Sequence, residues 1–295
     1  MASTAVDFLS YVTSRERLAQ VSALTQNVPL FLPRRHILGR VLPECFATTL
    51  GVSLLFTTFL YLYRRVTPQE KRCTLAYRLT NIVVNAVLAV IGLYGEMFVL
   101  PQLPTDEVAT YVQGLDDTTL VVTLMLGYQL WALVAGTLFV KESLVMMGHH
   151  IAVFMVAIMY LTFTNGFRYH AFYFAGIWEV SSIPLAIMNI LREKEGWKER
   201  HPILFLLIRA TFAFSFLILR IWIGTPRAFR YVTDLFVVAF CSPFDKPMLY
   251  HVFMTIMFLL SFFLAILQFY WAGLIMVMVV RNAYSIVRLL VKKMK

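Results

Sequence analysis

Seven long apolar runs dominate this sequence and restrict what it can fold into. They cover residues 45–63, 76–100, 119–140, 143–164, 170–191, 203–223 and 250–280. Each is close to the roughly 20 apolar residues that an α-helix needs to cross the hydrocarbon core of a bilayer. Charged residues make up only 14% of the chain, whereas soluble globular domains carry about 25%. We therefore expect an all-α, polytopic membrane protein with about seven transmembrane helices.

The ends of the chain are less apolar than these runs. Residues 1–44 are at best amphipathic, and three prolines interrupt any long helix there, so we expect a peripheral segment. The run 45–63 then forms an extra transmembrane helix ahead of the other six. Residues 286–295 form a basic tail.

Two further features predict local departures from straight helices. Residues 227–240 are too short and too charged to cross a bilayer alone, which predicts an interfacial or re-entrant helix in a long loop. Pro184 follows two serines inside the fifth run, which predicts a kink at that proline.

The excess of basic residues, a formal net charge of +10, indicates topology and not nucleic-acid binding. No polar domain is available to carry nucleic acid, so we expect none as a partner. Lys and Arg concentrate in the loops 64–75 and 192–201 and in the C-terminal tail, all on one side of a seven-helix chain. The positive-inside rule places the C-terminus in the cytosol, or in the matrix if the membrane is mitochondrial.

Adjacent histidines, His149 and His150, lie inside the fourth apolar run and are the first candidate catalytic residues. Ionisable side chains in a bilayer are costly, face a protein or water-lined interior, and indicate a functional site. The alternative interpretation is that they hydrogen-bond neighbouring helices. Paired metal ligands on a helix are typically four residues apart, and no histidines here have that spacing, so we expect no metal site.

The remaining polar residues of the spans are few, and helical spacing places several of them on common faces. We expect the following to line an interior chamber: Arg78, Asn81, Asn85, Glu142, Glu179, Ser182, Asn189, Arg209 and Arg220. Arg209 and Arg220 are eleven residues apart, three helical turns along one face. They can pair with Glu179 or Glu96, or they can bind a phosphate or carboxylate headgroup.

An ordered set of short motifs resembles a known family. The set comprises Tyr77-Arg78, Gly127-Tyr128, His149-His150, Asn165-Gly166-Phe167, Glu179-Val180-Ser181-Ser182 with Asn189, and Phe216-Leu217-Ile218-Leu219-Arg220-Ile221-Trp222. Together these resemble the TLC-domain family, which includes the ceramide synthases, and the resemblance covers about residues 70–285. It implies that the last six helices form a barrel around a lipid-sized chamber.

The first functional hypothesis is lipid modification, and it follows from the resemblance. The ceramide synthases transfer an acyl chain from acyl-CoA to a long-chain amine and reside in the endoplasmic reticulum. By that resemblance, His149 or His150 is a general base or forms a covalent acyl intermediate. Acyl-CoA is then a co-substrate, and no covalently bound cofactor is expected.

The second hypothesis is a non-catalytic, lipid-binding subunit of a large membrane assembly, such as a mitochondrial respiratory complex. Two differences from the family favour it. Many members carry an Asp shortly after Gly-Tyr, where this chain reads Gln129-Leu130-Trp131-Ala132, and they often carry a His at the position of Asn85. Its partners are membrane lipids, a bound phospholipid among them, and other membrane-protein subunits, in the mitochondrial inner membrane. A transporter or seven-helix receptor is disfavoured, because inverted repeats and receptor motifs are not recognisable.

Overall fold

The computed structural model describes residues 36–102, 118–163, 168–194, 196–241 and 247–294. These residues are helical and contain no β-strand, and seven helices are long and apolar enough to cross a membrane. The predicted fold class is therefore confirmed. Because lipid offers no hydrogen-bond partners, backbone groups in apolar runs of this length are satisfied only within a helix.

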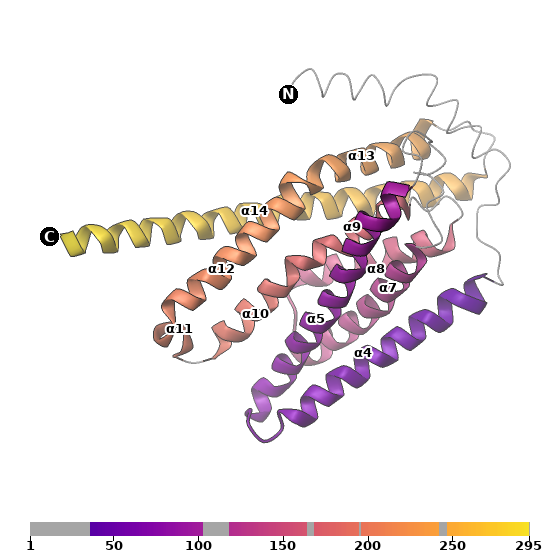
Figure 1. Cartoon of the computed structure of the whole chain (residues 1–295). Coiled ribbons are helices and arrows are strands. Elements are labelled where there is room, and N and C mark those ends of the chain that lie inside the picture. Colours follow the sequence, from indigo (N-terminus) through magenta and orange to yellow (C-terminus); the bar gives the residue numbers. More distant parts are fainter. Residues whose placement is uncertain (1–35, 103–117, 164–167, 195, 242–246, 295) are drawn as a thin grey trace, which may run out of the picture.

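The first four spans are nearly continuous helices (Figure 1). They are η1 Ile37–Val41 with α4 Leu42–Leu62, α5 Gln69–Tyr94 with η2 Gly95–Val99 and η3 Leu100–Gln102, α7 Thr118–Ala135 with η4 Gly136–Val140, and α8 Leu144–Thr162. The fifth and sixth spans are more interrupted, whereas the seventh is one continuous helix. The fifth span comprises η5 Arg168–His170, α9 Ala171–Phe174, η6 Ile177–Val180 and α10 Ser182–Glu193. The short helix α11 Trp197–Arg200 connects it to the sixth span, which comprises α12 Pro202–Phe216, η7 Leu217–Trp222, α13 Gly224–Phe236 and η8 Val237–Cys241. The seventh span is α14 Met248–Met294.

The first span starts earlier than predicted, at Ile37 and not at residue 45. The prediction is wrong because Pro43 does not end the helix. Pro43 lies directly after the π-helix η1, within one continuous helical run. The wider π-turn accommodates a residue that has no N–H to donate to the preceding turn. Residues 1–35, most of the predicted peripheral segment, lie outside the described residues.

The fifth span is broken, but not at Pro184 as predicted. Helix α9 ends at Phe174, the 3-10 helix η6 follows, and α10 starts at Ser182. Pro184 therefore lies in the first turn of α10, where it continues the chain without a kink. The break occurs at Gly176, where an added Cβ would lie only 2.4 Å from the Cα of Gly92 on α5. The two glycines let the backbones of adjacent helices come this close.

The expected interfacial helix at residues 227–240 is instead the continuation of the sixth span. Residues 202–240 form one long helical run that contains the π-helix η7. The charged segment is too short to cross a bilayer alone. It does not have to cross alone, because it extends the apolar helix that precedes it.

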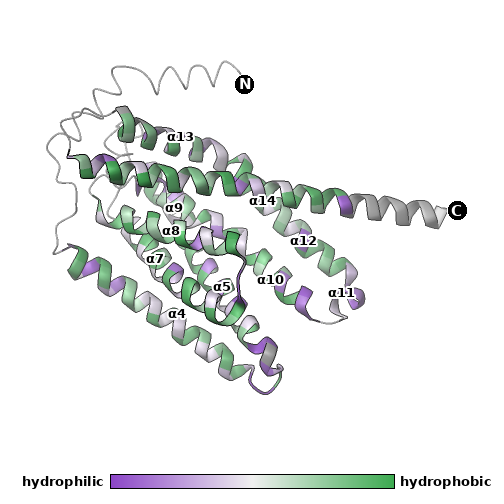
Figure 2. Ribbon diagram, turned by 180° about the vertical axis from the view of Figure 1, so that it is seen from behind, coloured by the Kyte–Doolittle hydropathy of each residue, from purple (hydrophilic) through white to green (hydrophobic). Residues whose placement is uncertain are grey.

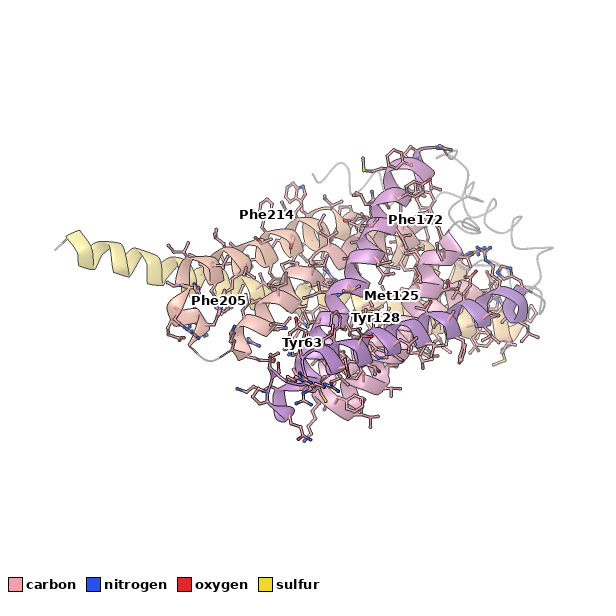
Figure 3. The ribbon with its side chains drawn as sticks, turned by 60° about the horizontal axis from the view of Figure 1, so that its bottom comes forward. Tyr63, Met125, Tyr128, Phe172, Phe205 and Phe214 are labelled. Carbon is pink, nitrogen blue, oxygen red and sulfur yellow. The ribbon has the colours of Figure 1, made fainter. Side chains whose placement is uncertain are left out.

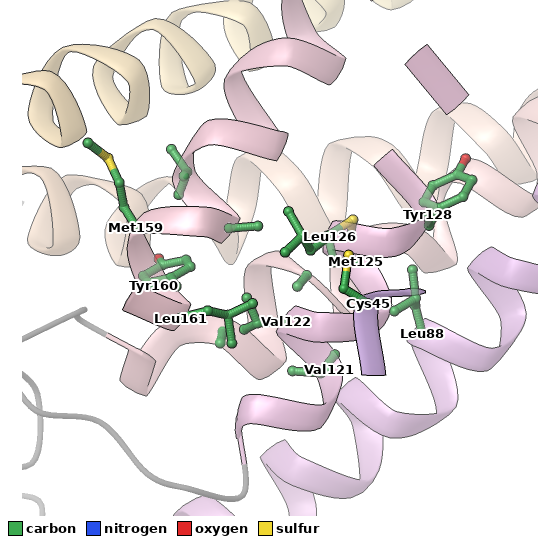
Figure 4. Close-up of a cluster of buried hydrophobic side chains, with 14 of the residues drawn as sticks. Cys45, Leu88, Val121, Val122, Met125, Leu126, Tyr128, Met159, Tyr160 and Leu161 are labelled. Carbon is green, nitrogen blue, oxygen red and sulfur yellow. The ribbon is translucent and has the colours of Figure 1, made fainter. Parts of the chain in front are cut away.

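Helix α7 lies at the centre of the molecule, and α4 lies at its edge. In the most apolar window of each span, 72% of the residues are buried for α7 and only 17% for the first span. Figure 4 shows Val121, Val122, Met125 and Leu126 of α7 packed beside Tyr160 and Leu161 of α8. This packing fixes α8, which carries the two histidines, against the central helix.

The outer surface of the bundle is apolar. Phe214 on α12 is 69% exposed, whereas Phe205 on the same helix is buried, and Figure 3 shows both. Hydrophilic residues gather at the helix ends, for example where α4 joins α5 and around α11 (Figure 2). The exposed apolar side chains match a surface that faces lipid. Residues 286–294 of the basic tail continue α14, whose C-terminal part projects beyond the other helices (Figure 1).

Candidate functional site

A cavity of about 470 Å³ lies between the last six spans. Its volume falls within the roughly 300–1,000 Å³ of small-molecule sites. Each of these six spans contributes lining residues, while α4 contributes none. The polar residues of the lining are Tyr77, Arg78, Asn81, Asn85, Tyr128, Gln129, Glu142, His149, His150, Glu179, Ser181, Ser182, Asn189, Arg192 and Arg220. The predicted chamber inside the last six helices is thus present.

A second, smaller cavity of about 80 Å³ lies further along α8. Its walls are mostly apolar, with Val153, Val156 and Ala157 on one side. Three polar side chains line both cavities: His149, Glu179 and Arg220. These three residues therefore mark the junction between a polar and an apolar compartment.

The histidines reach the larger cavity from the first turns of α8. This helix starts at Leu144 and is capped by Ser143, whose Oγ accepts a hydrogen bond from the backbone N–H of Met146 at 3.3 Å. Both imidazoles line the cavity, and their ring centroids are 5.6 Å apart. The two candidate catalytic residues are therefore in one place and within reach of one ligand.

The two histidines differ in their surroundings. His150 is buried, and its Nδ1 lies 2.6 Å from Oε1 of Gln129 on α7. The His149 ring packs edge-on against Trp271 of α14, and its buried Nδ1 has no hydrogen-bond partner among the described residues. Successive helical residues point about 100° apart, which explains why one ring contacts α7 and the other contacts α14.

Arg220 is held by the fold. Its guanidinium donates to Ser181 Oγ at 2.8 Å, the Trp178 carbonyl at 2.8 Å, Ser182 Oγ at 3.0 Å and Gln268 Oε1 at 3.4 Å. Its Nη2 also lies 3.9 Å from the Glu179 carboxylate. The guanidinium thus bonds the chain at the break in the fifth span, where backbone groups are left without helical partners.

Of the two interpretations of Arg220, the geometry favours a contact within the protein over a headgroup, because four of its five N–H groups already have protein acceptors. The Glu179 carboxylate lies close to the guanidinium but is not one of these acceptors. Glu96, the other acidic residue considered, pairs instead with Arg227 at 2.6 Å.

The end of the larger cavity nearest the basic loops is charged. Arg78 forms a bidentate contact with Glu193 Oε1, at 3.0 Å from Nε and 2.9 Å from Nη2, and the exposed Arg192 lies nearby in the lining. Glu142 lies in the short connection between η4 and α8. Burial raises the pKa of the Glu142 carboxyl, and Arg78 and the Tyr77 hydroxyl counteract part of that shift.

Arg209 lines neither cavity, so the prediction that it faces the chamber is wrong. Its guanidinium lies over the ring of Phe205 on its own helix, 5.7 Å from the centroid. A spacing of eleven residues places two side chains on one face only in an uninterrupted α-helix. Arg220 lies in the π-helix η7, which begins at Leu217, and the wider π-turn changes the direction of Arg220 relative to Arg209. The other chamber residues predicted from the sequence all lie in the lining of the larger cavity.

The lining also contains residues that were not predicted, among them Gln129, Tyr128 and Trp271. Gln129 entered the sequence argument only as a difference from the family, although a polar residue in an apolar run was itself a usable signal. Nothing in the sequence marks Trp271 as facing an interior, because aromatic residues occur all around α14. Among the described residues, no group of three or more His, Cys, Asp and Glu is placed to hold a metal ion.

Comparison with known proteins gives one match. The family model of the TRAM, LAG1 and CLN8 group, described as the TLC domain, matches residues 74–277. Searches of curated proteins and of solved structures find no match. The matched region includes the six helices that line the larger cavity and both histidines. This confirms the resemblance drawn from the motifs, and the chain belongs to the TLC-domain family.

Proposed function

We propose that this protein binds a lipid in the larger cavity and transfers an acyl group to it from acyl-CoA, with His149 and His150 as the catalytic pair. The observation that carries the proposal is that both imidazoles line a ligand-sized cavity. The imidazole of His149 also lines the smaller, apolar cavity. An amphiphile bound there has its polar end beside the imidazoles and a chain along the apolar walls.

The proposed chemistry is acyl transfer with proton transfer through imidazole. The substrate amine attacks the thioester carbonyl, the C–N bond forms and the C–S bond breaks. A histidine takes the proton from the amine and returns it to the departing sulfur, so coenzyme A leaves as the thiol. General base catalysis of this kind contributes about 10²–10⁴-fold in rate.

The charged end of the cavity favours entry of an anionic co-substrate. Arg192 is exposed and lines the cavity, and Arg78 lies beside it. Arginine side chains bind phosphate groups well because their N–H groups match phosphate oxygens in pairs. We place this end and the C-terminus in the cytosol, with the protein in the endoplasmic reticulum.

The test is acyl transfer by the full-length protein in lipid nanodiscs, with radiolabelled acyl-CoA and a long-chain amine. We expect His149→Ala and His150→Ala each to reduce turnover by about 100-fold or more. The matched control is His201→Ala, because His201 is exposed and lines neither cavity. Retained transfer in both variants, with thermal unfolding unchanged, contradicts the proposal.

A second candidate is the lipid-binding subunit of a larger assembly, in the mitochondrial inner membrane with the C-terminus in the matrix. It is favoured by the way the fold itself uses polar groups of the chamber: His150 bonds Gln129, and Arg220 bonds the broken fifth span. Gentle purification distinguishes the two candidates. A stable complex of several different subunits that carries bound phospholipid and shows no transfer supports the assembly, and an active protein without partners contradicts it.

A further inference from the structure

Gln129 is a buried polar residue of the central helix that contacts His150 directly. Its side chain is only 2% exposed and that of His150 only 7%. The Oε1 of Gln129 lies 2.6 Å from His150 Nδ1, and its Nε2 lies 3.2 Å from the sulfur of Met125, one turn earlier on α7. Both ends of the amide therefore have a partner.

The orientation of the amide determines which nitrogen of His150 carries the proton. Methionine sulfur is a weak acceptor and cannot donate, so the amide NH₂ belongs on the side of Met125. The amide oxygen then faces His150 Nδ1, and an oxygen only accepts. Nδ1 must carry the hydrogen, which leaves Nε2 with its lone pair. No hydrogen bond from the described residues reaches that Nε2.

We propose that Gln129 is a positioning residue that holds His150 as the neutral, Nδ1-protonated tautomer and leaves Nε2 as its proton-accepting atom. The structural part of this inference stands on the contact alone, and its catalytic consequence rests on the proposed function. An amide orients the ring as a carboxylate does, but it adds no negative charge to stabilise an imidazolium. Gln129 thus retains the orienting function that the neighbouring groups of catalytic histidines commonly have.

The first experiment measures the tautomer directly, without turnover. The full-length protein is labelled with ¹⁵N-histidine in nanodiscs, and the ring ¹⁵N shifts of His150 are assigned by their loss in His150→Asn. We expect the wild type to show the Nδ1-protonated form. Gln129→Leu removes the acceptor at nearly constant volume and is expected to give a mixture of tautomers, while Gln129→Glu restores the Nδ1-protonated form.

The matched control is Gln268→Leu, the same substitution at another buried glutamine, which lines neither cavity. It is expected to leave the His150 tautomer unchanged. If Gln129→Leu fails to fold, Gln129→Asn provides the test, because the shorter side chain withdraws the carbonyl and is expected to give the same mixture.

The second experiment uses the acyl-transfer assay. We expect Gln129→Leu to lower kcat by about tenfold or more, with KM nearly unchanged and with partial recovery in Gln129→Glu. An Nε2-protonated wild type, or a tautomer that does not change in Gln129→Leu, overturns the inference whatever the activity. A tautomer that behaves as expected in a protein without transferase activity supports the positioning contact and contradicts only the proposed function.

Discussion

Removing the guanidinium of Arg220 is expected to destabilise the protein strongly, because the fold and not a ligand uses it. Arg220→Met keeps much of the volume and removes all four hydrogen bonds to the fifth span and α14. The partners left behind are buried or half-buried: Ser181 is 1% exposed and Gln268 is 3% exposed.

The expected magnitude follows from the burial of the charge. Arg220 is a buried charge that donates four hydrogen bonds, and a hydrogen bond from a charged group contributes about 1.5–3 kcal/mol, so we expect Arg220→Met to lose at least about 3 kcal/mol. The distance of 3.9 Å between Arg220 and Glu179 is at the long end for an ion pair. We therefore expect Glu179→Gln to cost less, about 1 kcal/mol, close to the net value of a single hydrogen bond.

The assay is equilibrium unfolding in mixed detergent micelles, followed by tryptophan fluorescence. Arg209→Met is the matched control, because it makes the same substitution in the same long helical run but outside both cavities. We expect the free energy of unfolding of the Arg209→Met control to stay within about 0.5 kcal/mol of the wild type. A loss below 1 kcal/mol for Arg220→Met, together with loss of bound lipid, refutes the reasoning and assigns Arg220 to the ligand.

Three other substitutions test local features of the fold. Lys141 has a positive φ of 54°, so Lys141→Gly is expected to raise stability by up to about 1 kcal/mol in thermal unfolding, and a loss of stability contradicts that expectation. At Gly92, an added Cβ would lie 2.6 Å from backbone atoms of Gly176 and Phe172, so Gly92→Ala is expected to lower the free energy of unfolding by about 1–3 kcal/mol. Gly39→Ala is the control, because an added Cβ there meets nothing within 4 Å; equal losses in the two variants contradict the close packing at Gly92. The pKa of Glu142 is raised in the folded protein, so protonation of its carboxyl stabilises the folded state. This stabilisation is present below the ordinary pKa of about 4.3 and is lost as the pH rises through the raised pKa of the folded state. Glu142→Gln is therefore expected to melt above the wild type at pH 7 and with it near pH 4, and identical melting at both pH values argues against the burial of this carboxyl.

The sequence predicts the helices well and their interruptions poorly. Apolar run length decides whether a segment crosses a bilayer, and the seven predicted spans correspond to the seven observed. The breaks depend on tertiary contacts that no local pattern reveals. The fifth span breaks at Gly176 because Gly92 lies against it, and the sixth continues through a π-helix because α13 packs along α14.

For the candidate site, too, the sequence predicts which residues gather but not the contacts that each of them makes. Costly polar residues inside apolar runs identify the chamber, and the histidine pair lies in its wall as expected. What each residue does there depends on its partners. The spacing of Arg209 and Arg220 is misleading because Arg220 lies in a π-helix. The contact of Gln129 with His150 exists only because α7 and α8 pack together.

The most direct test of the account is an electron cryomicroscopy map of the full-length protein in nanodiscs made from native lipid. We expect non-protein density for one amphiphile in the larger cavity, with its polar end within hydrogen-bonding distance of His149 or His150. Imidazoles packed tightly against neighbouring side chains, with no space beside them, would contradict it.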